Sequence, residues 1–166
     1  MSDTKIGRQF TFDSFEVTKA NNKAFEAAKK FAEIADSKPL ALFGGTATGK
    51  THLLYAVKNK IEQNDPEHKV ILNTTAEIQD HLTHVLQNGG TGKNFREKYL
   101  RADILLIDDI QEIAGKEKTQ KELILIFNQF YESGKRIMMT SSTSDDKGII
   151  ERLRSRFFFG DSVYLT

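Results

Sequence analysis

The sequence predicts an α/β fold, a three-layer sandwich built on a five-stranded parallel sheet. Two observations support this fold class. Short apolar runs of strand composition alternate along the chain with segments of helical periodicity. The first apolar run is followed directly by Gly44–Thr51, which fits the phosphate-binding pattern G-x-x-x-x-G-K-[ST]. A strand, this loop and a helix, in that order, form a recurrent nucleotide-binding motif.

The composition is that of one soluble globular domain. The chain has 166 residues, of which 39% are hydrophobic and 28% are charged. The net charge is only +1, so any contact with nucleic acid must come from a local basic patch. The chain lacks cysteine, which excludes disulfides, and it has no apolar run long enough to span a membrane. These features predict a cytoplasmic protein.

The N-terminal part is expected to reach the sheet through an arm and a helix. Residues 1–9 are polar and are expected to form a loose segment. Residues 10–17 mix aromatic and polar side chains, which indicates an extended arm lying on the domain. A helix with one apolar stripe begins near Asn21 or Asn22, and Ser37-Lys38-Pro39 ends it before the first strand.

Beyond this point strands and helices alternate. Strands are predicted at 39–43, 69–73, 103–109, 136–142 and 162–166. Helices are predicted at 51–63, 74–86, 95–100, 117–132 and 149–156, the second of them capped by Thr74 or Thr75. Because helical crossovers join parallel strands, these elements form one sheet. Residues 10–166 are therefore expected to be one domain without an internal boundary.

The loop that follows the first strand has the residue types that phosphate binding requires. Glycine at 44 and 49 permits backbone angles that turn successive N–H groups toward phosphate oxygens. Lys50 can reach the β and γ phosphates, and the Thr51 hydroxyl can bind Mg²⁺. The alternative is a plain glycine-rich turn, which the flanking strand and helix disfavour. The predicted nucleotide-binding residues of the loop are Gly45, Thr46, Ala47, Thr48, Gly49, Lys50 and Thr51.

Two aspartates follow the four aliphatic residues of the third predicted strand. A buried strand would deliver Asp108 beside the Thr51 hydroxyl, where the two side chains can hold Mg²⁺. Asp109 would then face the γ phosphate and activate water as a general base. On its own, this pattern would fit a strand that ends in a solvated acidic turn. The phosphate loop upstream favours the metal-binding interpretation.

The last two predicted elements also carry polar candidates. Thr140-Ser141-Ser142 ends the fourth strand and can direct hydroxyl groups at the γ phosphate, although these residues can equally serve as ordinary strand ends. In the short basic helix that follows, Arg152 and Arg156 share one face. An arginine there can stabilise the transition state in a neighbouring subunit, whereas sequence physics alone favours a solvated basic helix.

Several segments taken together resemble the AAA+ ATPase domain of the bacterial replication initiator DnaA. In chain order they are 12–15, 44–54, 95–99, 105–120 and 152–157. The runs Asp-Asp-Ile-Gln, Gly-Lys-Glu-Lys-Thr-Gln and Arg-Leu-Arg-Ser-Arg-Phe are far more specific than a phosphate loop. The resemblance extends over residues 10–166 without interruption and implies a P-loop NTPase of AAA+ type.

The resemblance implies an ATP-switched initiator that assembles into a filament at the origin and contacts single-stranded DNA. It also implies ATP and Mg²⁺ as cofactors and weak ATPase activity. By position, Arg156 matches the arginine that completes the next subunit's site, and Arg152 the basic residue before it. Lys116, Lys118 and Thr119 match positions that touch single-stranded DNA. Without the resemblance, a solvated loop and an ordinary helix cap would be preferred for these three.

The chain departs from the family pattern in a few places. A third glycine is usual where Ala47 stands, and the polar sensor of the γ phosphate, usually acidic, falls at Ser142. Thr18 replaces a usual glycine in the arm. The chain ends at the fifth strand, so we expect a core without the helical lid, with weaker nucleotide binding and slow hydrolysis. Either a fragment or a natural minimal protein fits this length.

Three functional hypotheses follow. The first is the ATP-switched initiator domain. The second is a DnaC-like helicase loader or regulatory adaptor that binds another replication protein, with the replicative helicase as partner. The third is a nucleotide-binding remnant that neither assembles nor hydrolyses ATP. All three depend on nucleotide binding through Lys50 and Thr51.

Overall fold

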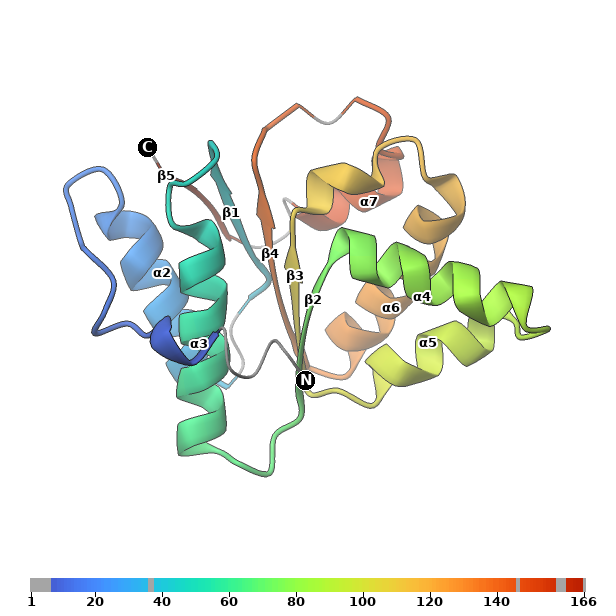
Figure 1. Cartoon of the computed structure of the whole chain (residues 1–166), viewed down its shortest axis with the longest axis horizontal. Helices are drawn as coiled ribbons and strands as arrows, with labels where there is room; N and C mark the ends of the chain where they lie inside the picture. The colour runs from blue at the N-terminus through green and yellow to red at the C-terminus, as the bar shows by residue number, and fades with distance from the viewer. Residues whose placement is uncertain (1–6, 36–37, 146, 158–160, 166) are drawn as a thin grey trace.

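A five-stranded sheet lies between two layers of helices (Figure 1). The computed structural model describes residues 7–35, 38–145, 147–157 and 161–165. The strands are β1 (Leu40–Gly44), β2 (Val70–Thr74), β3 (Ile104–Asp108), β4 (Arg136–Ser141) and β5 (Asp161–Leu165). Their order is β2-β3-β4-β1-β5 and every neighbouring pair is parallel. The predicted three-layer sandwich with a five-stranded parallel sheet is therefore confirmed.

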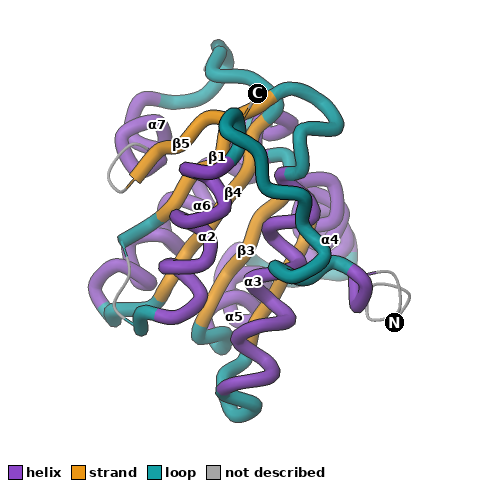
Figure 2. Tube along the Cα trace, turned by 90° about the vertical axis from the view of Figure 1, so that its left-hand side faces the viewer, coloured by secondary structure: helices purple, strands orange, loops and turns teal. Residues whose placement is uncertain are grey.

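The helices divide between the two faces of the sheet (Figure 1). One face is covered by α2 (Asn22–Glu33) and α3 (Lys50–Asn64). The other is covered by α4 (Thr75–Gln87), α5 (Gly92–Leu100), α6 (Glu117–Glu132) and α7 (Glu151–Phe157). Two 3₁₀ turns, η1 (Gly7–Gln9) and η2 (Ile110–Ile113), complete the described elements. Figure 2, in which α2 and α3 face the viewer, shows the strands behind them as one sheet.

The strand residues alternate between two hydrophobic cores, as the period of two in a β-strand requires. On β3, Ile104 and Leu106 pack with α2 and α3, whereas Leu105 and Ile107 pack with the opposite helices. All four side chains are at most 1% exposed. A strand buried on both faces has an uninterrupted apolar sequence, which is why this segment could be recognised from sequence.

The N-terminal segment joins the domain earlier than expected. Residues 1–6 lie outside the described residues, but residues 7–9, which we expected to be loose, form η1. Gly7 is buried, and a β-carbon there would lie 2.1 Å from the ring of Tyr55. The Asn59 side chain donates hydrogen bonds to the carbonyls of Gly7 and Phe10, both at 2.9 Å. Because residues 7–9 pack closely on α3, they form a regular turn and not a loose segment.

Capping residues set the starts of α4 and α5. Thr74 caps α4 in a capping box with Glu77, which settles the choice between Thr74 and Thr75. Helix α5 begins at Gly92, three residues before the predicted start, because Thr91 and Asn94 form a second capping box. The 3₁₀ turn η2 was not predicted.

Candidate nucleotide-binding site

The candidate site lies where the carboxyl ends of three strands meet. Since β4 lies between β1 and β3, it separates the phosphate loop from the acidic end of β3. The phosphate loop leaves β1 at Gly44, Asp108 ends β3, and Thr140 and Ser141 end β4. The carboxyl edge of a parallel sheet is the usual position of a ligand site in α/β folds.

The loop adopts two left-handed backbone conformations. Ala47 has φ +62° and Gly49 has φ +103°, and α3 begins immediately afterwards at Lys50. The Thr48 hydroxyl donates to the carbonyl of Gly45 at 2.8 Å, which closes the turn. The N–H groups of the first turn of α3 have no partner within the helix and carry its positive dipole. The loop thus has the features of an anion-binding site.

Lys50 is folded back onto the loop. Its ammonium group donates to the carbonyls of Gly44 and Gly45, each at 2.6 Å, and the residue is 6% exposed. Burial lowers the pKa of Lys50, while the negative charges of Asp109 and Asp108 act in the opposite direction. The ammonium group is therefore held by two carbonyl acceptors, which a phosphate can replace.

Asp108 joins three segments of the site. Its Oδ2 accepts a hydrogen bond from the Thr51 hydroxyl at 2.8 Å, and its Oδ1 accepts one from the Thr140 hydroxyl. Asp108 is 5% exposed and Thr140 is completely buried. Oxygen donors of this kind are the ligands that Mg²⁺ prefers. The Thr51–Asp108 pair expected from sequence is thus brought together, and Thr140 holds the other carboxylate oxygen.

Asp109 also adopts a left-handed conformation, with φ +61°. Its N–H donates to the Thr140 hydroxyl at 3.0 Å, and its Oδ1 accepts from the amide nitrogen of Gln111 at 3.4 Å. The Gln111 oxygen in turn accepts the N–H of Ser142 at 3.1 Å. Gln111 therefore connects the predicted base to the predicted sensor. Sequence reasoning noted Gln111 within a motif but assigned it no role, because its partners lie on different segments.

Arg152 and Arg156, the two candidate arginines of α7, lie on a helix that packs against α6. Arg156 is half-buried, and its Nε donates to the side-chain oxygen of Asn128 on α6 at 2.8 Å. Arg152 is exposed.

The three residues expected to touch DNA do not share one environment. Lys116 and Lys118 are exposed at the start of α6. Thr119 is 1% exposed, and its hydroxyl donates to the side-chain oxygen of Gln79 on α4. The lysine side chains are thus at the surface, while the Thr119 side chain is turned into the contact between α4 and α6.

The N-terminal arm packs directly on the phosphate loop. A β-carbon at Gly49 would lie 2.8 Å from the ring of Phe15, so glycine is required there for space as well as for backbone angle. The ring of Phe15 also meets His52 edge to face, with centroids 5.1 Å apart. His52 Nε2 donates to the carbonyl of Thr11 at 2.8 Å. His52 therefore holds the arm against α3.

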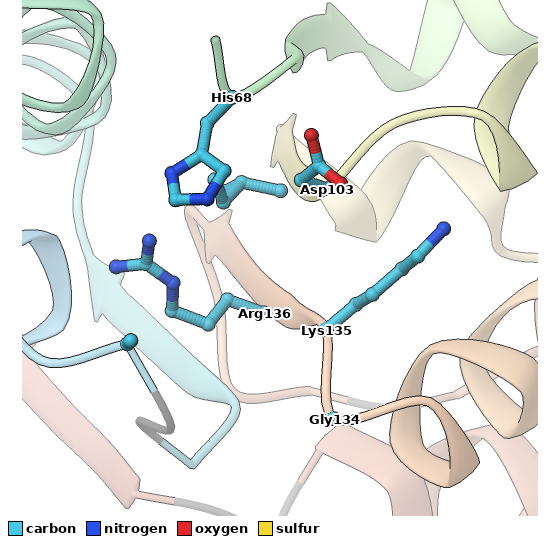
Figure 3. A pocket seen from close by; sticks show the side chains of 7 residues that line it. His68, Asp103, Gly134, Lys135 and Arg136 are labelled. Atoms are coloured by element: carbon cyan, nitrogen blue, oxygen red, sulfur yellow. The ribbon is translucent and has the colours of Figure 1, made fainter. Parts of the chain in front are cut away.

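A hollow lined by polar and charged residues lies at the amino-terminal ends of β3 and β4 (Figure 3). It is lined by Ala35, His68, Asp103, Ile104, Gly134, Lys135 and Arg136. Its cations already serve as helix caps: Arg136 donates to the carbonyl of Phe31 at 2.7 Å, and Lys135 to that of Leu100 at 2.7 Å. The Asp103 carboxylate accepts the N–H of Lys69 at 2.8 Å. These contacts are structural, and they place no group near the phosphate loop.

Comparison with known proteins gives one consistent result. The family model described as the bacterial DnaA ATPase domain matches residues 6–164. The chromosomal replication initiator protein DnaA of Lactiplantibacillus plantarum is 38% identical over 170 residues, covering 100% of this chain and 37% of the relative. That of Lachnoclostridium phytofermentans is 42% identical over 164 residues, covering 95% of this chain and 36% of the relative. The chain thus spans little more than a third of these relatives.

Solved structures agree with the sequence comparison. Domain III of the Thermotoga maritima replication initiation protein DnaA superposes with a TM-score of 0.92 at 36% identity, covering 96% of this chain and 68% of that chain. A replication initiator DnaA bound to AMPPCP and single-stranded DNA superposes with a TM-score of 0.88 at 33% identity, covering 95% of this chain and 50% of that chain. The DnaC helicase loader superposes with a TM-score of 0.80 at 17% identity, covering 98% of this chain and 99% of that chain. At this identity the similarity is one of fold alone. Within the part of the chain that the structure describes, no helix has the length and apolar character of a membrane span.

Proposed function

The chain belongs to the family of bacterial DnaA ATPase domains, and from that membership we propose that it is the ATP-switched domain of a replication initiator. ATP binding lets copies of the chain assemble and contact single-stranded DNA at an origin. One observation carries the proposal: the Asp108 carboxylate accepts hydroxyl groups from both Thr51 and Thr140. These contacts hold the phosphate loop and the acidic strand end together, as P-loop NTPases require for binding a phosphate and its metal ion.

The proposed ligand is ATP with Mg²⁺. The loop amides of Gly45–Thr51 surround the phosphates, and Lys50 exchanges the carbonyls of Gly44 and Gly45 for phosphate oxygens. The Thr51 hydroxyl and the Asp108 carboxylate lie 2.8 Å apart and fit the oxygen-ligand preference of Mg²⁺. Bound Mg²⁺ would neutralise charge on the β and γ phosphates. The 33% identical DnaA that is bound to AMPPCP supports this assignment.

Slow hydrolysis is the proposed reset of the switch. Asp109 activates the attacking water, and Gln111 orients its carboxylate through a 3.4 Å hydrogen bond. Ser142 contacts the γ phosphate as the polar sensor. Arg156 of one subunit stabilises the transition state in the next, after leaving Asn128. Arg152 lies one turn earlier on α7 and contributes positive charge to the same contact between subunits.

Single-stranded DNA is proposed to bind at the start of α6. Lys116 and Lys118 are exposed there and can hold phosphates without reading sequence. The N–H groups of the first helical turn add to the positive potential. Thr119 contributes its backbone, because its hydroxyl is engaged with Gln79. The 33% identical DnaA that is bound to single-stranded DNA supports DNA binding by this fold.

Size-exclusion chromatography with light scattering tests this proposal. The chain with ATP and Mg²⁺ is expected to form oligomers that dissociate when the nucleotide is omitted. Arg156→Ala should abolish the oligomers while nucleotide binding persists, because Arg156 acts on the neighbouring subunit's nucleotide. Lys50→Ala should abolish both. Arg101→Ala is the matched control, since Arg101 is exposed at the end of α5.

Two results would argue against an initiator domain. A wild-type chain that binds no ATP would contradict every hypothesis that depends on the phosphate loop. A chain that binds ATP, stays monomeric and captures a purified replicative helicase would favour the loader or adaptor instead. The fold likeness to the DnaC helicase loader makes this second result the specific alternative.

A further inference from the structure

A buried glutamine near the start of α6 joins the end of η2 to the segment that leads into α7. Gln120 lies in the second turn of that helix and is completely buried. Its amide nitrogen donates to the carbonyl of Ile113 at 2.8 Å and to that of Gly148 at 2.9 Å. Its oxygen accepts the N–H of Ile150 at 2.8 Å. Both donors and the acceptor of this side chain are therefore used, and all three partners are backbone groups of other segments.

The first partner sets the position of the lysine segment. The carbonyl of Ile113, at the end of η2, also accepts the N–H of Lys116 at 2.8 Å. The N–H of Gln120 itself bonds to the carbonyl of Lys116 at 3.0 Å. Lys116 is thus bonded through its carbonyl to the backbone of Gln120, and its N–H shares the Ile113 carbonyl with the Gln120 side chain. The exposed lysines that follow are fixed with it.

The other partners set the position of α7. The N–H of Ile150 bonds to Gln120, while the carbonyl of Ile150 accepts the N–H groups of Leu153 and Arg154 at 3.0 and 3.1 Å, which begin α7. Gly148 has φ +83°, and its carbonyl also accepts the N–H of Gly115 at 2.9 Å. A β-carbon at Gly148 would lie 3.1 Å from the nitrogen of Gly115, so the two loops are in direct contact.

We propose that Gln120 is a positioning residue that couples single-stranded DNA binding to self-assembly, because its side chain holds the lysine segment and α7 in one fixed relation. This inference rests on the proposed function, in which the lysines bind DNA and α7 presents Arg156 to the next subunit. A buried hydrogen-bond network in which every group is satisfied is rigid, so displacement of one segment is passed to the other. Since coupling between two binding events is reciprocal, DNA strengthens assembly and assembly strengthens DNA binding.

Gln120→Met is the test variant, because methionine keeps the length of the side chain and removes all three hydrogen bonds. The carbonyls of Ile113 and Gly148 keep the N–H groups of Lys116 and Gly115, and only the N–H of Ile150 loses its partner. The variant is therefore expected to fold, with a melting temperature lowered by several degrees.

Two controls separate positioning from stability. Gln129→Met makes the same substitution at an exposed position of α6. Ile126→Val, at a buried position of the same helix, lowers stability but leaves the hydrogen bonds of Gln120 intact. Both are expected to behave as the wild type in the coupling measurement.

Sedimentation velocity with ATP and Mg²⁺, with and without oligodeoxythymidine, measures the coupling. For the wild type and both controls, the oligonucleotide should raise the association constant about tenfold, within the range usual for coupled sites. For Gln120→Met this ratio should fall to about one, while assembly without DNA stays within about threefold of wild type. A readout that depended on stability alone would change in Ile126→Val as well.

The outcomes separate this inference from the proposed function. An unchanged ratio in Gln120→Met would overturn the role of Gln120, and a ratio of one in the wild type would overturn the coupling while leaving nucleotide-driven assembly intact. A wild-type chain that does not assemble with ATP would refute the proposed function, and this inference with it.

Discussion

At the scale of single residues, two backbone conformations mark the site. Ala47 and Asp109 are the non-glycine residues with positive φ among the described residues. Such a conformation costs about 1–2 kcal/mol for a residue with a β-carbon, and it gathers at functional sites. The position of Ala47 could be predicted, since the family pattern has glycine there. That of Asp109 could not, because Thr140, 31 residues away, helps to impose it.

Replacing Ala47 by glycine tests the strain in the phosphate loop. Glycine removes the left-handed penalty of about 1–2 kcal/mol, and the greater freedom of the unfolded chain offsets about 0.4–1 kcal/mol of that gain. Ala47→Gly should therefore leave the free energy of unfolding unchanged or raise it by up to about 1.6 kcal/mol in urea denaturation. The control Ala76→Gly, at an exposed position of α4, should lose about 1 kcal/mol. Equal losses in both variants would show that Ala47 is unstrained.

At the scale of elements, periodicity predicted the strands and helices but not their contacts. Apolar spacing predicted both the first and the last residue of α6, because its inward side chains repeat along one face. The strand order places β4 between β1 and β3, and no local pattern contains that information. For this reason the contact of Thr140 with Asp108, and the three bonds of Gln120, could not be predicted. The inward orientation of Thr119 depends equally on the packing of α4.

The contact between α4 and α5 makes stability depend on pH. His81 Nδ1 and the hydroxyl of Tyr99 form a hydrogen bond of 3.0 Å at this contact. Burial lowers the pKa of His81, and the charges of Lys98 and His84 lower it further. The unfolded chain, with an ordinary histidine pKa of about 6.5, then binds the proton first as the pH falls. The contribution of His81 is fully present above that pH and is lost below it.

His81→Gln should remove this part of the pH dependence. Thermal denaturation between pH 7.5 and 5 is expected to show a smaller fall in melting temperature for the variant than for the wild type. His68→Gln, on the loop before β2, keeps the His81–Tyr99 contact and should retain the wild-type fall. If the His81 variant and the wild type fall in parallel, protonation of His81 is not coupled to folding.

At the scale of the whole molecule, the charge balance means that the proposed DNA binding must depend on a local basic patch. The net charge is +1, so long-range attraction to a polyanion is weak. The sheet divides the chain so that α2 and the arm lie over one face, while α6, with the exposed lysines at its start, lies over the other (Figure 1). A lysine carries the same charge on either face of the sheet. If DNA binds at the start of α6, however, only the lysines there should change the affinity for DNA.

Two double variants with the same net charge distinguish local from global electrostatics. Lys116→Ala/Lys118→Ala should weaken binding to oligodeoxythymidine and reduce the slope of log affinity against log salt by about 1.4, because each phosphate contact contributes about 0.7 for single strands. Lys19→Ala/Lys23→Ala, at exposed positions near the start of α2, should leave the slope unchanged. Fluorescence anisotropy titrations over a range of salt concentrations measure both. Because the two variants lower the net charge equally, an equal loss of slope would mean that overall charge, and not the start of α6, holds the DNA.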